Sequence, residues 1–161
     1  MSAVISKCGL YRYLLEREPG DKPLVFVMLN PSTADAERDD PTIRRCRGFA
    51  KELGYTGILV VNLYAFRATK PADLGAAKDP IGIDNDAYIL KVCRDRDVCC
   101  AWGANGELSR AHEVLSAIHS VSGKTFSLGL TKAGMPRHPL YVKGSQMLLP
   151  FDLPRKRLKR D

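Results

Sequence analysis

Residues 24–29 read Leu-Val-Phe-Val-Met-Leu, the longest apolar run of the chain, and Asn30 and Pro31 follow directly. A short run of this kind is typical of a strand that is buried on both faces of a parallel sheet. Three further runs of similar character follow, at residues 58–62, 98–102 and 125–128. The pattern therefore predicts four central strands.

Helical patterns separate these runs. Asp40 and Pro41 supply an N-cap and a first-turn proline, apolar residues then recur at helical spacing, and Gly54 ends the pattern. Two further helices are predicted over residues 84–94 and 107–121. This alternation predicts an α/β fold, a three-layer α/β/α sandwich around a mostly parallel four-stranded sheet.

The N-terminal region predicts one more strand. Tyr11, Tyr13 and Leu15 alternate with polar neighbours, and a turn signal follows at residues 18–21. We expect an antiparallel strand added at the edge of the sheet. No internal linker is apparent, so we expect a single α/β domain over residues 1–153 and a basic C-terminal tail over residues 154–161.

Composition and charge bound the class of protein. The 161 residues are 45% hydrophobic and 27% charged, which is the balance of one globular domain. The net charge of +7 favours an anionic partner, and more than half of it comes from residues 155–161. That tail is either a solvated segment or an arm that binds phosphates.

The cysteines and the apolar runs indicate the compartment. No pair of cysteines has the C-x-x-C spacing of a zinc or redox site, so we expect reduced, mostly buried thiols, no metal and no cofactor. No apolar run is long enough to span a bilayer or to form the core of a signal peptide. We therefore expect a cytoplasmic protein without a membrane partner.

Candidate site residues follow the predicted strands, because an open parallel sheet binds its ligand at the carboxyl ends of the strands. Pro31 holds Asn30 in an extended turn, where the amide can orient a water molecule or cap its own turn. Asn62 ends the second run, and its amide can pair with a nucleobase edge or cap a loop.

The later strand ends add an imidazole and several cations. His138 lies in the loop after the fourth run and can donate a hydrogen bond to negative charge on a leaving group. Trp102 is expected mainly to pack, and Gly103 permits close approach of a ligand. The residues that can meet phosphates, each also compatible with a solvated face, are Arg44, Arg45, Arg47, Lys132 and Arg137.

Several acidic residues lie in the segment after Asn30. One of their carboxylates, rather than Asn30, therefore remains a candidate for the catalytic base. Most of these acids are expected to be solvated, and Asp40 is expected to serve as the helix cap. The acids are Asp35, Glu37, Asp39 and Asp40.

The segments that carry these residues resemble a family of small bacterial and phage proteins known as domain of unknown function 1643. The resemblance covers nearly the whole chain before the basic tail and implies no particular chemistry. Its motifs are Leu29-Asn30-Pro31-Ser32-Thr33-Ala34-Asp35, Asp40-Pro41-Thr42-Ile43-Arg44-Arg45-Cys46, Asn62-Leu63-Tyr64-Ala65-Phe66-Arg67-Ala68, Ala101-Trp102-Gly103 and Arg137-His138-Pro139-Leu140-Tyr141.

The same landmarks, in the same order, are similar to those of the uracil-DNA glycosylase superfamily. That resemblance implies that Asn30 positions the hydrolytic water, Asn62 reads the base and His138 stabilises the leaving group. We further expect substrate contacts by Pro31, Ser32, Asn62, Trp102, Gly103, Arg137 and Leu140, and contacts with the nucleic-acid backbone by Arg44, Arg45 and Lys132.

Three departures from the superfamily pattern stand out. Met28-Leu29 replaces the usual glycine before Asn30, and Leu140-Tyr141 replaces the serine-proline after the His-Pro step. The cysteine spacings do not match those of the branches that carry an iron–sulfur cluster. Leu140 can still act as a wedge in a duplex.

The expected function is hydrolysis of the N-glycosidic bond of a damaged or modified base in nucleic acid, with DNA as the favoured partner. Two alternatives stay open. One is a nucleic-acid-binding module without catalysis, and the other is an enzyme that acts on a free modified nucleotide.

Overall fold

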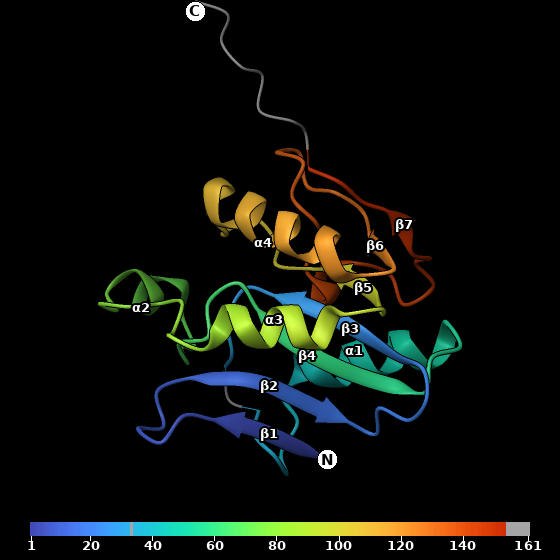
Figure 1. Ribbon diagram of the computed structural model, residues 1–161. Coiled ribbons are helices and arrows are strands. Elements are labelled where there is room, and N and C mark those ends of the chain that lie inside the picture. Colours follow the sequence, from blue (N-terminus) through green and yellow to red (C-terminus); the bar gives the residue numbers. More distant parts are fainter. Residues whose placement is uncertain (33, 154–161) are drawn as a thin grey trace, which may run out of the picture.

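The computed structural model describes residues 1–32 and 34–153, and the predicted basic tail lies outside this range. Within it, a seven-stranded mixed sheet has the order β1-β2-β4-β3-β5-β6-β7 (Figure 1). The strands are β1 (Ser2–Ile5), β2 (Arg12–Arg17), β3 (Pro23–Met28), β4 (Gly57–Asn62), β5 (Asp97–Cys100), β6 (Lys124–Ser127) and β7 (Leu149–Pro150). The helices are α1 (Pro41–Glu52), α2 (Pro71–Gly75), α3 (Asn85–Cys93), α4 (Leu108–Val121) and the 3-10 helix η1 (Pro139–Tyr141).

The sheet is mixed, which confirms the α/β class, and it is larger than predicted. β3 pairs in parallel with β4 and β5, and β5 pairs in parallel with β6. β1, β2 and β7 join antiparallel at the two edges. β2 is not the edge strand that the sequence predicted, because β1 pairs outside it. The sequence pattern did not predict β1 and β7, because both are short and neither contains a buried residue.

Two apolar cores lie on opposite faces of the sheet. On one face α1 packs against β3 and β4 through Ile43, Cys46 and Phe49, and on the other α3 and α4 pack through residues such as Ile89 and Leu115. In Figure 1, α3 and α4 lie in front of the sheet and α1 lies behind it. All six residues of β3 are buried, so this strand needs both helical layers.

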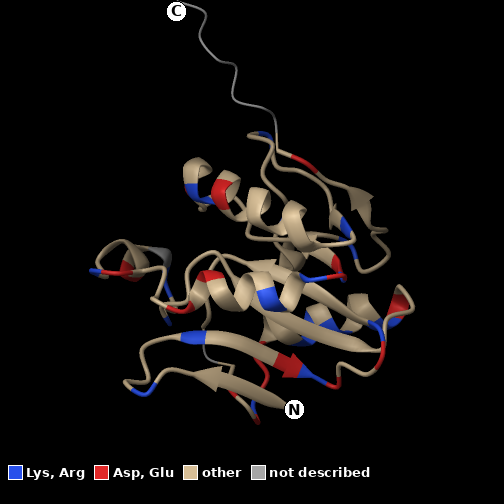
Figure 2. Cartoon of the chain, viewed as in Figure 1, with Lys and Arg blue, Asp and Glu red and all other residues tan. Residues whose placement is uncertain are grey.

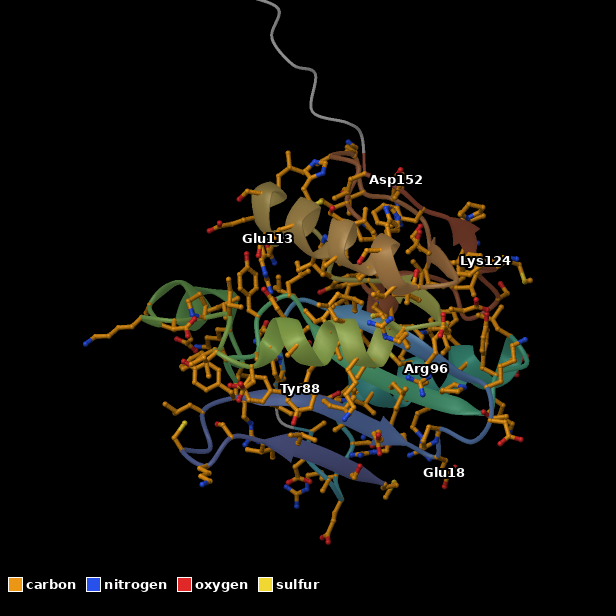
Figure 3. The ribbon with its side chains drawn as sticks, viewed as in Figure 1. Glu18, Tyr88, Arg96, Glu113, Lys124 and Asp152 are labelled. Carbon is orange, nitrogen blue, oxygen red and sulfur yellow. The ribbon has the colours of Figure 1, made fainter. Side chains whose placement is uncertain are left out.

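Side-chain character follows this layering. β3 and β4 contain no charged residue, and Figure 2 shows the charges in loops, on helices and on the flanking strands. Tyr88 of α3 stacks on Tyr13 of β2 with ring centroids 5.3 Å apart (Figure 3).

Four of the five cysteines are buried, and burial raises the pKa of each of these thiols. No helix in the described ranges has the length and hydropathy that a membrane span requires.

Two buried arginines of β2 hold the segment between β3 and α1. Arg17 donates to Asp39 Oδ1 at 2.6 Å and to the carbonyls of Asp35 and Arg38. Arg12 Nη1 donates to the carbonyl of Ala34 at 2.7 Å. These bonds tie residues 34–39 to the sheet, and Asp40 then begins α1 by accepting from the Ile43 N–H at 2.9 Å.

Replacement of Arg17 by Met is expected to lower the free energy of unfolding by roughly 3 kcal/mol or more, because it leaves several carbonyls and part of the Asp39 carboxylate without their donor. Urea denaturation followed by circular dichroism measures the loss. Arg44→Met is the control, since Arg44 is exposed on α1, and a change within about 0.5 kcal/mol is expected. Equal losses in both variants would contradict the role given to Arg17.

Candidate functional site

A cavity of about 610 Å³ opens at the carboxyl ends of the parallel strands. β3 is followed along the chain by β4 on one side, and β5 lies on its other side, so the chain reverses direction across β3. A crevice forms at such a switch point because the connections leave the sheet in opposite directions. This cavity lies where the strand pattern places a ligand site.

Most of the predicted site residues meet in this cavity, although they come from four separate segments. Those that line it are Asn30, Ser32, Asn62, Trp102, Gly103, Lys132, Arg137, His138 and Leu140. Pro31, Arg44 and Arg45 are not among the lining residues. The roles of all of them stay predictions, and the geometry below says what each side chain can do.

Asn62 has a buried amide without a partner. The residue is 1% exposed, and neither Nδ2 nor Oδ1 has a hydrogen-bond partner among the described residues. Its main-chain carbonyl is held by Asn85 Nδ2 at 3.0 Å, so the strand end is fixed while the side-chain amide is left unused. A buried amide without a partner costs roughly 1–3 kcal/mol. The side chain therefore offers an N–H donor group and a carbonyl acceptor to whatever enters the cavity.

The side-chain nitrogen of Asn30 already has two hydrogen-bond partners. Nδ2 donates to the carbonyl of Pro31 at 3.0 Å and to that of Ala68 at 2.7 Å. Because both partners are acceptors, the amide orientation is determined and Oδ1 is the atom left over. Asn30 thus caps its own turn, as one reading of the sequence expected, and also presents an acceptor at the cavity.

The hydrogen bonds of His138 determine its tautomer. Nδ1 accepts from the Leu140 N–H at 3.2 Å and so caps η1, which places the proton of the neutral ring on Nε2. Burial lowers the pKa of His138 below its ordinary 6.5, and the Asp40 carboxylate offsets only part of this effect. His138 is therefore neutral at pH 7 and carries its one N–H on Nε2.

Gly103 and Trp102 shape the wall beside His138. Gly103 has a φ of +77° and donates to the Pro136 carbonyl at 2.8 Å, and a Cβ at this position would lie 3.4 Å from Cβ of His138. Trp102 is buried edge-on against Phe151, with ring centroids 5.9 Å apart. Trp102 is thus the packing residue that the sequence predicted, and its ring also lines the cavity.

Two residues predicted to contact ligand or phosphate, neither of which lines the cavity, make structural hydrogen bonds. Arg45 donates to the carbonyls of Pro139 and Val142, which fastens the loop around η1 to α1. Pro31 is buried, and its carbonyl accepts from Asn30 and from the Ala68 N–H. The sequence pattern does not reveal the bonds of Arg45, or the bond from Ala68 to Pro31, because they join segments that are far apart in the chain.

The sequence pattern missed Arg12, which was counted among the polar neighbours of an edge strand. The side chain is 2% exposed and lines the cavity, and its Nε has no partner among the described residues. Burial lowers the pKa of Arg12 to about 10, against an opposing effect of Asp40, so the guanidinium stays charged at neutral pH. Arg12 lies outside the four predicted central strands, so its place in the cavity does not follow from the ends of those strands.

Asp40 is the cavity's carboxylate. Asp35 accepts from the Glu37 and Arg38 N–H groups, and Asp39 pairs with Arg17 and Arg47. Asp40 is the helix cap that the sequence predicted, and it also lines the cavity, with no second acid beside it in the described ranges.

Comparison with known families agrees with the extent of this fold. The model of the family described as Protein of unknown function (DUF1643) matches residues 12–140, which include β2 through β6. The chain belongs to this family. No curated protein matches the chain, and no solved structure does.

Substitution of Gly103 by Ala is expected to lower the free energy of unfolding by about 1 kcal/mol or more, because an L side chain is strained at this positive φ. Chemical denaturation measures the loss, and the NMR signals of His138 report displacement of its loop. Gly48→Ala in α1 is the matched control. No atom lies within 4 Å of its added Cβ, so a gain of about 0.5–1 kcal/mol is expected. A gain at both sites would contradict the constraint at Gly103.

Proposed function

We propose that this member of the DUF1643 family binds a nucleobase in the cavity and hydrolyses its N-glycosidic bond, in the manner of a uracil-DNA glycosylase. The single observation that carries the proposal is the buried Asn62 amide, whose donor and acceptor both lack partners. Adjacent donor and acceptor atoms complement the O=C–N–H edge of a base such as uracil or hypoxanthine.

The size and position of the cavity support a flipped nucleotide as ligand. About 610 Å³ accommodates a base and its sugar, but not a stacked duplex. The target nucleotide must therefore leave the stack, which costs a few kcal/mol and least for damaged or unpaired bases. Lys132 and Arg137 are exposed at the rim, where a phosphate backbone would pass, and exposed Leu140 can fill the gap in the stack.

The proposed chemistry uses two further groups. The C1′–N bond breaks with its electron pair on the base, water oxygen bonds to C1′, and the base leaves with one proton from that water. His138 Nε2–H donates to a base oxygen as negative charge grows there, so it stabilises the transition state more than the ground state. Asn30 Oδ1 accepts from the attacking water and aims it. An amide takes no proton, so turnover is slow and favours good leaving groups.

One observation favours a base-binding module without catalysis as the second candidate. Asn30 Nδ2 already bonds to two carbonyls, a purely structural use of the residue that would position the water. Such a module would bind the modified base through Asn62 and release nothing. Binding without abasic sites distinguishes it from the enzyme.

Oligonucleotides that carry uracil, hypoxanthine or hydroxymethyluracil test the proposal, with alkali-labile abasic sites as the product. We expect cleavage of at least one substrate and a loss of about a hundredfold or more in His138→Ala and in Asn30→Ala. Asn62→Leu is expected to abolish activity without loss of stability, since it removes an unpaired buried amide.

Two controls sharpen this assay. His119→Gln removes an exposed histidine of α4 and is expected to leave the rate unchanged. Asp40→Asn keeps a good helix cap and tests the alternative carboxylate base, because a loss beyond tenfold would assign that role to Asp40. Unchanged rates in both His138→Ala and Asn30→Ala would refute the mechanism even if the substrate is cleaved.

The rate of base release is expected to fall as the pH drops through a midpoint below 6.5 and to be level above it. Protonation puts a hydrogen on Nδ1 of His138 opposite the Leu140 N–H, which breaks the cap of η1. The lowered pKa places this change on the acid side of the ordinary histidine value. The pH–rate profile and an NMR titration of the His138 ring measure it. His138→Gln should lack this acid limb, and a midpoint above 6.5 in the unmodified protein would count against the assignment.

A further inference from the structure

Three arginines in the described ranges are buried, and one of them lacks an acidic partner. Arg17 is 1% exposed and pairs with Asp39 at 2.6 Å, and Arg110 is 4% exposed and pairs with Asp86 at 2.7 Å. Arg12 is 2% exposed, but no carboxylate of these ranges lies within 4.0 Å of its guanidinium.

The hydrogen bonds of Arg12 do not replace the missing partner. Its one side-chain bond runs from Nη1 to the Ala34 carbonyl at 2.7 Å, and Nε has none among the described residues. A buried charge is unfavourable unless it is paired and hydrogen-bonded. Arg17 and Arg110 show that this fold pairs its other buried guanidinium groups, so the exception at Arg12 calls for an anion from outside the chain.

The location of Arg12 says where that anion would lie. Arg12 and Asn62 both line the cavity, and they belong to the paired strands β2 and β4. The other cations of the lining are Lys132 and Arg137, whereas its one carboxylate is Asp40, which already accepts from Ile43. Arg12 is therefore the buried cation of a cavity that is positive on balance.

We propose that Arg12 binds a negatively charged group of the ligand, so that the cavity prefers an anionic base or nucleotide to its neutral counterpart. The charged group is a carboxylate on the base or the phosphate of a nucleotide, and the Nε–H and Nη–H donors of Arg12 take its oxygens. The inference rests on the proposed function in placing a nucleobase in the cavity, and it does not depend on cleavage.

The fluorescence of Trp102 reports on this binding, because it is the single tryptophan of the chain and it lines the cavity. Two matched pairs of ligands are titrated: uracil against its 6-carboxylate, and uridine against uridine 5′-monophosphate. Inorganic phosphate alone is a fifth probe. We expect the charged member of at least one pair to bind about tenfold or more tightly than the neutral member.

Variants assign the preference to Arg12. Arg12→Gln should remove it, so that the charged and neutral members of a pair bind with similar affinity, and Arg12→Lys should retain part of it. Arg96→Gln is the charge-matched control. Arg96 directly precedes β5, lines a second cavity and donates to the Val92 carbonyl, so the preference should persist in this variant.

The outcomes separate the two sources of charge and the two proposals. A preference confined to the carboxylate pair places the anion on the base, and one confined to the nucleotide pair, or shared by inorganic phosphate, places it on the phosphate.

Equal affinities within both pairs, no binding of any charged probe, or a preference that survives Arg12→Gln would overturn the inference. If Arg12→Gln does not fold, the wild-type pairs and Arg12→Lys decide. Cleavage of neutral bases without an anion preference would refute this inference and leave the proposed function standing.

Discussion

Burial of β3 on both faces is the constraint on which the rest of the structure depends. A strand without an exposed face needs helices above and below it, and the chain supplies α1 on one side and α3 and α4 on the other. Reaching both faces requires the chain to reverse direction across β3, so the connections diverge at the carboxyl ends of the strands. The cavity is a consequence of this reversal, and the segments that line it are those that leave the divergent strand ends.

The polar groups in and around the cavity divide into those that hold the surrounding segments and those that have no hydrogen-bond partner. Asn30 Nδ2, the Asp40 cap, Arg45 and His138 Nδ1 hold the surrounding segments through hydrogen bonds. The Asn62 amide and Arg12 Nε have no such use within the described ranges. Because buried polar groups without partners lower stability, their presence at one cavity is the observation that supports the proposed binding site.

β2 shows how one strand serves both purposes. Arg17 is paired and holds the segment before α1, whereas Arg12, five residues earlier, lacks an acidic partner and lines the cavity. The same strand thus connects the stability of the segment after β3 with the charge of the site. A change at Arg17 is expected to act on folding, whereas a change at Arg12 is expected to act on folding through the Ala34 carbonyl and on the proposed ligand.

Local sequence determined the four central strands, the three longer helices and the Asp40 cap, because apolar runs and capping residues act over a few neighbouring positions. It also pointed to Asn30, Asn62 and His138, since strand ends can be read from where an apolar run stops. Tertiary structure alone decided that β1 lies outside β2, that Arg45 fastens the loop around η1 and that Arg12 is buried beside the site. These depend on contacts between segments far apart in the chain, and a side chain's burial and hydrogen bonds are set by such neighbours rather than by its own residue type.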